Sequence, residues 1–374
     1  MTSARTRAAS TWVLLILASA LSAVSCSASC PLDEQTVEEI VGLADAHIEA
    51  DVTPGLVLAI RCGAAYWIEA FGLSVIKTRE PMDSSFQFFV GSISMQFVAA
   101  SVLKLRESGL LDLDDPITEH IDDVPDDWSA ITFRHLLTHT SGANSFGGYS
   151  ALPFDNWSVY SSESVIRSML TGKLFFAPGE EFLFGRTTGY AVLAYIVERT
   201  TGETIEAYIE REFLAPLKLL DTGFATVRPP AQLAGFYHHY WNGKAMFEEV
   251  PHFDTALGSA MYSTAADLFA WQIALSTGRV ISDDSYALMT EQVTTRNAEG
   301  VVETHNYGLG LEVYVNEDGV LVELGHVGES GHRCGLWEYP AADIVVVALQ
   351  NCDRPLRPLL EDIEAVLFRQ GASG

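Results

Sequence analysis

The feature that most restricts the fold of this chain is the way strand and helix patterns alternate along its 374 residues. Residues 55–72 read as two strands with a turn near Gly63, and residues 308–350 read as four successive strands. Helical periodicity fills most of the chain between them. Because neighbouring strand groups tend to join one sheet, we expect the two chain ends to meet as one antiparallel sheet.

The fold class predicted is therefore α+β. The antiparallel sheet, flanked by helices, forms a lobe from about residues 32–91 and 300–374, and a mainly helical lobe of about residues 92–299 is inserted into it. Helical patterns are predicted at 32–50, 97–109, 189–217, 261–278 and 356–368.

Residues 1–29 have the features of a secretory signal. Arg5 and Arg7 precede an apolar run at 12–24, which is shorter than the roughly 20 apolar residues that span a bilayer. Small residues just before Cys26 make it a candidate lipid anchor, and ordinary cleavage nearby is an alternative that the sequence leaves open. On either reading we expect an exported protein, periplasmic, envelope-anchored or extracellular, whose domain spans residues 31–374.

The charge of the chain is strongly acidic, with 22 basic against 49 acidic residues and a formal charge of -27. Such a surface disfavours nucleic acids and anionic membranes as partners. Five cysteines are present, but no His or Cys cluster has the spacing of zinc ligands. We therefore expect no metal and no other cofactor, and the sequence does not predict an oligomeric state.

The segment at 88–97 has the layout of a serine acyl-transferase site, except that one position does not hold the residue type that this chemistry needs. A glycine and Ser92 lead into a long amphipathic run, so Ser92 is expected in the first turn of a buried helix, where serine is also suited to cap the helix. Ser-x-x-Lys chemistry needs a lysine three positions later, on the same face. That position holds Met95, which cannot accept a proton.

Several long blocks, in the expected order, resemble the class C β-lactamases and the related D-alanyl-D-alanine peptidases and esterases. The most specific block is Ile131–Gly142, and the others are Leu111–Pro116, Tyr262–Leu268 and Tyr307–Gly310. The resemblance covers essentially the whole mature chain and implies a β-lactamase/transpeptidase-like fold. His135 and His139 lie in the signature block, where we interpret them as hydrogen-bonded structural histidines rather than catalytic ones.

The resemblance implies acylation of Ser92 followed by hydrolysis, with the Ser92 N–H forming part of an oxyanion hole. Met95 takes the place of the lysine that acts as the base. Loss of a positioned general base typically costs a factor of about 10²–10⁴ in rate. Lys104, one of five lysines, lies twelve residues from Ser92 along the predicted helix, about 18 Å at the usual rise.

The second motif that the resemblance implies, Tyr-x-Asn, is also lost. Counting from Pro178 places Phe184 at the tyrosine and Arg186 at the asparagine. Counting back from Tyr190 places Gly185 and Thr187 there instead, and the sequence leaves the register open. Phe184 lacks the hydroxyl that relays protons, and Arg186 stays charged, so it can bind an anion but not act as a base.

The third motif is partly kept in Gly325–Gly328. His326 matches the family's strand residue, valine replaces a hydroxyl at 327, and Gly328 would let the strand approach a ligand. The N–H of Glu329 would be the second oxyanion donor. His326 titrates in a range suited to a general base, while the alternative is a family-typical residue of the cleft wall.

Three function hypotheses follow. The first is an exported pseudoenzyme whose cleft binds a small molecule or peptide without turnover, because three proton-handling or hydroxyl positions are altered together. The second is a residual hydrolase of an ester, amide or lactam that uses Ser92 through an acyl-enzyme, with His326 and a backbone oxyanion hole. The third is a lipid-tethered envelope protein whose acidic surface is the functional part, which requires lipidation of Cys26.

Overall fold

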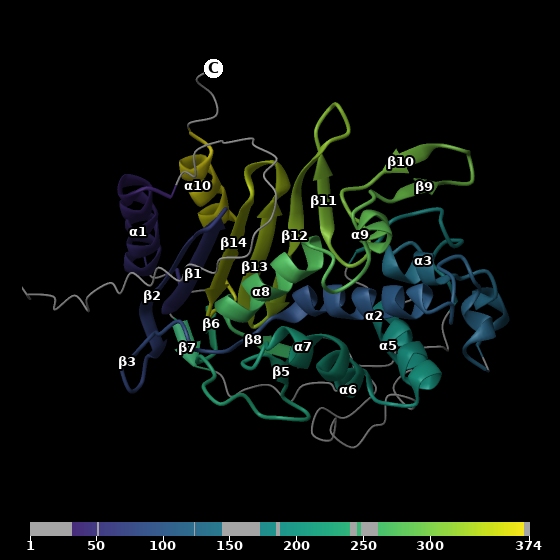
Figure 1. Cartoon of the computed structure of the whole chain (residues 1–374), viewed down its shortest axis with the longest axis horizontal. Coiled ribbons are helices and arrows are strands. Elements are labelled where there is room, and N and C mark those ends of the chain that lie inside the picture. Colours follow the sequence, from purple (N-terminus) through teal and green to yellow (C-terminus); the bar gives the residue numbers. More distant parts are fainter. Residues whose placement is uncertain are drawn as a thin grey trace, which may run out of the picture.

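The computed structural model describes residues 32–50, 52–122, 124–143, 173–184, 188–239, 245–247 and 261–369. The expected signal sequence and Cys26 lie outside these residues, so the predictions made for them stay predictions. Figure 1 shows the arrangement of the elements, with both ends of the described chain on the same side of the main sheet.

The main sheet has seven antiparallel strands drawn from both ends of the chain. Their order is β11-β12-β13-β14-β1-β2-β3. At its centre β1 pairs with β14, from Leu56 opposite Gln350 to Cys62 opposite Ile344. The prediction that the chain ends meet in one antiparallel sheet is thereby confirmed. The strands are β1 (Gly55–Cys62), β2 (Ala65–Val75), β3 (Glu80–Pro81), β11 (Glu312–Val315), β12 (Leu321–Ser330), β13 (His332–Tyr339) and β14 (Ile344–Gln350).

Helices cover both faces of the sheet. Helices α1 (Glu34–Glu49) and α10 (Arg357–Leu367) pack together on one face, and α8 (Ala265–Ser276) packs against β1 and β14 on the other (Figure 1). Successive side chains of β1 alternate between two cores, because residues of a strand point to opposite faces in turn. Leu58 belongs to the core beneath α1 and α10, while Val57 and Ala59 belong to the larger core that α8 covers.

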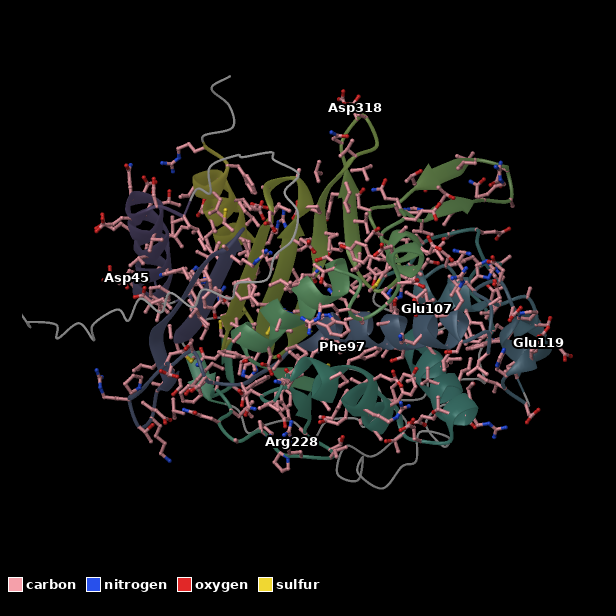
Figure 2. All side chains as sticks on the ribbon, in the orientation of Figure 1. Asp45, Phe97, Glu107, Glu119, Arg228 and Asp318 are labelled. Atoms are coloured by element: carbon pink, nitrogen blue, oxygen red, sulfur yellow. The ribbon has the colours of Figure 1, made fainter. Side chains whose placement is uncertain are left out.

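Helix α2 (Met95–Glu107) runs through the larger core and explains why the helical lobe has a fixed position relative to the sheet. Phe97 stacks on Trp271 of α8 with ring centroids 3.7 Å apart, and both rings are buried. Figure 2 shows Phe97 inside the molecule, whereas the acidic Asp45, Glu119 and Asp318 lie towards its edges. The helix ends at Glu107, two residues before the predicted end at Gly109.

The middle of the chain contains short helices and small sheets around α2. The further helical elements are η1 (Gly91–Ser94), η2 (Ile117–Glu119), η3 (Asp126–Trp128), α3 (Phe133–Leu137), α5 (Thr188–Thr201), α6 (Ile205–Ile209), the π-helical turn η6 (Glu210–Leu214), α7 (Ala215–Leu217), α9 (Asp283–Met289) and η7 (Pro340–Ala342). The further strands are β4 (Phe88–Phe89), β5 (Gly223–Phe224), β6 (Tyr237–His239), β7 (Ala245–Phe247), β8 (Met261–Ser263), β9 (Thr294–Arg296) and β10 (Val302–Thr304).

Two of the predicted helices differ from the structure. The pattern at 189–217 is divided, because Gly202 has a φ of +77° and the Thr204 hydroxyl caps a new helix by accepting from the Ala207 N–H. The pattern at 261–278 begins with a strand, since Met261–Ser263 pairs with β4 and β5, and only Ala265–Ser276 is helical. In both places tertiary pairing or a cap overrides the apolar periodicity.

Candidate active site

Ser92 lies in a single 3₁₀ turn, Gly91–Ser94, that leads directly into α2. The N-cap residue is Val90 for this turn and Ser94 for α2, so the expectation that Ser92 caps the helix is wrong. Ser92 is half-buried, and within the described part of the chain its hydroxyl makes no hydrogen bond.

Met95 is buried at the first position of α2, with 5% of its surface exposed. Its sulfur lies 3.8 Å from the hydroxyl of Tyr307, which also lies 3.2 Å from Nε2 of His139. The space where the resemblance implies a lysine is thus filled by an apolar side chain and bordered by a tyrosine and a histidine. Of the described lysines, Lys104 pairs with Glu107 at 3.5 Å, and Lys77, Lys173 and Lys218 are exposed.

His139 and Tyr307 are both uncharged near neutral pH. Burial lowers the pKa of His139 to about 3, with a further lowering from His326. Burial also raises the pKa of Tyr307 well above its usual value. A neutral imidazole and a protonated phenol can share one hydrogen bond, but neither is poised to take a proton from a serine at working pH.

The ring of Phe184 lies beside the rings of His139, Tyr307 and His326. The ring centroid lies 5.0 Å from that of His139, 5.6 Å from that of Tyr307 and 5.5 Å from that of His326. We call Met95, His139, Phe184, Tyr307 and His326 the Met95 cluster. This position favours the register counted from Pro178, in which Phe184 stands for the tyrosine. Arg186, together with Gly185 and Thr187 of the other register, lies outside the described residues.

His326 is buried on β12, with 1% of its surface exposed. Its Nδ1 lies 2.7 Å from the Val327 carbonyl oxygen, whereas Nε2 is buried and has no hydrogen-bond partner among the described residues. Burial lowers the pKa of His326, while the negative charges of Glu312 and Glu329 act in the opposite direction. The ring is thus neutral at pH 7, and Nε2 presents a lone pair.

The backbone of β12 passes very close to the turn that holds Ser92. A Cβ added at Gly328 would lie 1.8 Å from the Val90 carbonyl oxygen, and one added at Gly91 would lie 2.6 Å from the Glu329 nitrogen. Gly91 also has a φ of +52°, a conformation that favours glycine. Only glycines at these two positions permit the approach, which brings together the segments carrying the Ser92 and Glu329 N–H groups.

Comparison with known proteins gives the family of this chain. The model of the family described as "Beta-lactamase" matches residues 42–370. The chain belongs to the beta-lactamase family. A penicillin-binding protein of Bacillus subtilis (strain 168) is 25% identical over 334 residues, which are 84% of this chain and 72% of the relative. Esterase EstB of Burkholderia gladioli is 27% identical over 199 residues, 48% of this chain and 49% of the esterase.

Solved structures of the beta-lactamase fold agree with the architecture. The octameric penicillin-binding protein homologue from Pyrococcus abyssi superposes with a TM-score of 0.77 at 24% identity, covering 90% of this chain and 77% of that one. D-amino acid amidase from Ochrobactrum anthropi SV3, complexed with D-phenylalanine, has a TM-score of 0.74 at 21% identity and covers 91% and 100%. These likenesses confirm the predicted β-lactamase/transpeptidase-like fold.

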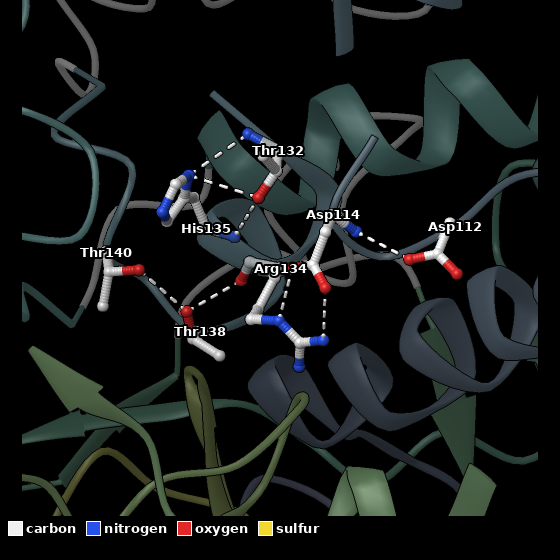
Figure 3. A network of polar contacts seen from close by, with 7 residues as sticks. All are labelled: Asp112, Asp114, Thr132, Arg134, His135, Thr138 and Thr140. Carbon is white, nitrogen blue, oxygen red and sulfur yellow. Dashed lines mark hydrogen bonds and ion pairs between the residues drawn. The ribbon is translucent and has the colours of Figure 1, made fainter. Parts of the chain in front are cut away.

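The family signature block is held by a network of local contacts, drawn in Figure 3. Arg134 makes a bidentate pair with Asp114 at 2.7 and 3.0 Å, and this pair joins the 131–142 block to the 111–116 block. Nδ1 of His135 accepts from the Thr132 N–H at 3.2 Å, while the Thr132 hydroxyl accepts from the His135 N–H. His135 therefore closes the capping box of α3, which is a structural role.

Sequence reasoning did not foresee the part that Tyr307 and His139 play in the Met95 cluster. From the sequence, Tyr307 is predicted only as a member of a family block and His139 only as a structural histidine. His139 has a φ of +57°, unusual for a residue other than glycine, and its ring contacts those of Phe182 and Tyr190 as well. No signal in the sequence places Tyr307 against Met95, 212 residues away.

No group of three or more His, Cys, Asp or Glu side chains that could hold a metal ion occurs among the residues described. None of the described helices combines the length and the apolar character that a membrane span requires. Cys62 is disulfide-bonded. Cys334 and Cys352 are buried free thiols, so the partner of Cys62 lies outside the described residues.

Proposed function

We propose that this member of the beta-lactamase family is an exported ligand-binding protein that does not perform fast acyl transfer. The observation that carries the proposal is Met95, a buried thioether where the chemistry needs a base, bordered by the hydroxyl of Tyr307 rather than by an amine. Phe184, without a hydroxyl, lies in the same cluster. Neither side chain can accept the Ser92 proton or return it to a leaving group.

One experiment tests the proposal directly. The purified mature protein is incubated with a reporter penicillin and, separately, with an activated ester, and the mass of the intact protein is followed with time. We expect no stoichiometric adduct on the timescale of ordinary acylation. Rapid addition of one acyl group to the wild-type protein, absent from the Ser92→Ala variant, would overturn the proposal.

A residual hydrolase is the second candidate, and one observation favours it. The close approach of Gly328 to Val90 and of Gly91 to Glu329 supports a two-donor oxyanion site made by the main chain. Oxyanion donors keep part of the catalysis when the proton-transfer residues are lost. His326, with an unpaired Nε2, is the candidate base in this scheme. Slow turnover of the ester that disappears in both Ser92→Ala and Glu329→Pro would support this candidate, since proline lacks the N–H donor.

Export is proposed on two independent grounds. The first is the signal-like segment at 1–29, and the second is the disulfide of Cys62, because disulfides persist mainly in oxidising compartments. Mass analysis of the mature protein distinguishes a lipid on Cys26 from plain cleavage. A diacylglycerol on Cys26 would support the envelope-tethered reading, and an uncleaved N-terminus in the cytoplasm would contradict export. The charge of -27 leads us to propose no nucleic-acid partner.

A further inference from the structure

His326 is the member of the Met95 cluster with a buried ring nitrogen, Nε2, that has no hydrogen-bond partner among the described residues. It lies on the same face of β12 as Gly328, which touches the Val90 carbonyl, since alternate residues of a strand share a face. Val327 points the other way and packs against the core beneath α1 and α10. His326 is thereby directed to the side of the sheet that holds Ser92.

The contact with Val327 fixes which nitrogen carries the proton. A carbonyl oxygen only accepts, so Nδ1 at 2.7 Å must donate, and the neutral ring then has its lone pair on Nε2. A buried acceptor without a partner is costly, and a ligand that donates a hydrogen there removes the cost. A carboxylate cannot do so, because it has no hydrogen to give.

The surroundings of Nε2 add two further requirements. Aromatic rings border the imidazole, with Phe184 at 5.5 Å and Tyr307 at 6.0 Å between centroids, and Phe184 is 45% exposed, so a ligand can reach its ring from solvent. The charges that act on His326 are negative, from Glu312 and Glu329. The guanidinium of Arg333 pairs with Glu329 at 2.6 Å and offsets its charge, so Glu312 supplies the larger part of the negative field at His326.

We propose that the site selects a ligand whose uncharged or cationic N–H group donates to Nε2 of His326 while an attached aromatic or apolar group lies against Phe184, and that it rejects a carboxylate at this position. The proposal rests on the proposed ligand-binding function and names the chemical class of the ligand. An amine or amide that carries an aromatic group fits all three observations: an acceptor without a partner, an aromatic wall, and a negative field.

Three probes of nearly the same shape test the proposal. Phenethylamine is a cation, phenylacetamide is neutral and phenylacetate is an anion. Binding to the full mature chain carrying Ser92→Ala is measured by calorimetry, so that no turnover intervenes. We expect the amine and the amide to bind and the carboxylate to bind at least about tenfold more weakly, as expected for one lost hydrogen bond in an unfavourable field.

Two variants separate the role of His326 from a general effect of the fold. His326→Phe keeps an aromatic ring but removes the acceptor, and should weaken the amine and the amide about tenfold while leaving phenylacetate unchanged. His305→Phe is the matched control, because His305 also neighbours an aromatic ring, that of Phe182, but its Nε2 is already paired with Thr295. It should leave the three affinities unchanged.

A nitrogen NMR signal of His326 keeps the test decisive if His326→Phe does not fold. Addition of phenylacetamide should shift the Nε2 resonance as its lone pair accepts a hydrogen bond, and an unmoved resonance at saturating amide would overturn the proposal. Equal or tighter binding of phenylacetate, or the absence of binding by both the amine and the amide, would also overturn it. Acylation of wild-type Ser92 by penicillin would refute the proposed function alone, since the probe affinities are measured without that serine.

Discussion

The substitution Met95→Lys tests the reading of the Met95 cluster in depth, because it restores the missing base in a site that is now neutral. The position is 5% exposed, and its polar neighbour is the Tyr307 hydroxyl, itself bound to His139. An ammonium here would be desolvated, because the polar group beside it in the described part of the chain is the uncharged hydroxyl of Tyr307. Burial of this kind lowers the pKa of a lysine, by up to about 3–5 units in extreme cases.

The magnitude follows from linkage between protonation and folding. A decrease of about 2–3 units corresponds to a loss of about 3–4 kcal/mol in the free energy of unfolding, since each unit is worth about 1.36 kcal/mol. At pH 7 the introduced lysine is charged in both states, and the full deficit is present. As the pH rises from its folded pKa towards about 10.4, the unfolded chain retains a proton that the folded chain has released, so the deficit shrinks.

The assay is urea unfolding of the wild type and of the variant at several values between pH 7 and pH 10. Met95→Leu is the matched control, which should cost less than about 1.5 kcal/mol and show no added pH dependence. A deficit in Met95→Lys that is absent at pH 7, or that grows with pH, would refute the view that this site is dry and neutral.

The same variant also tests the chemistry. Met95→Lys should not restore rapid acylation of Ser92, because Phe184 still lacks the hydroxyl that would pass the proton on. The double variant Met95→Lys with Phe184→Tyr should acylate faster than either single variant, as measured by intact mass. Strong turnover in Met95→Lys alone would show that Phe184 does not stand at the tyrosine position.

Three further predictions concern stability and are measured by chemical unfolding. Gly328→Ala should lower the free energy of unfolding by at least about 1–3 kcal/mol, because its Cβ would lie 1.8 Å from the Val90 carbonyl oxygen. Gly42→Ala, in a helix and with nothing within 4 Å, should raise it by up to about 1 kcal/mol. Equal effects of the two substitutions would contradict this packing. Thr132→Ala should lose about 0.5–2 kcal/mol through the capping box of α3, and an unchanged midpoint would contradict it. His139 has a folded pKa of about 3, below its unfolded value, so its stabilising effect is complete above about pH 6.5 and is lost as the pH falls towards 3. His139 thus adds at most about 1.4 kcal/mol per pH unit to the slope of the free energy of unfolding against pH. His139→Gln should reduce that slope, and an identical slope would exclude His139 as its source.

The sequence predicts the sheet well because its strands have a strong local pattern. The apolar run of β14 is readable without knowledge of the fold, and so is Gly331, which separates β12 from β13. The short strand β8 is not, since Met261–Ser263 is a strand only through its pairing with β4 and β5. Local pattern thus identifies long elements and misses those that depend on a distant partner.

The candidate site is predictable only where a family block carries it. Motif spacing predicts Ser92, Met95 and His326 as site residues, and it leaves open whether Phe184 or Gly185 stands at the tyrosine position. What spacing does not show is the state of each side chain: the unpaired Nε2 of His326 and the contact of Tyr307 with Met95 arise from packing between segments more than 200 residues apart. Protonation and hydrogen-bond partners are properties of that packing, and motif spacing carries no information about them.

The two glycines at 91 and 328 determine which substitutions leave the main-chain donors in place. The donors that they bring together belong to the main chain, so substitution of Met95 or Phe184 removes reactive groups without touching them. Reactive groups could therefore be introduced by substituting a few side chains, without any change in the fold. Under the proposed function, this scaffold is a suitable starting point for selecting acyl-transfer catalysts, in which variation is confined to the side chains and the backbone is left as it is.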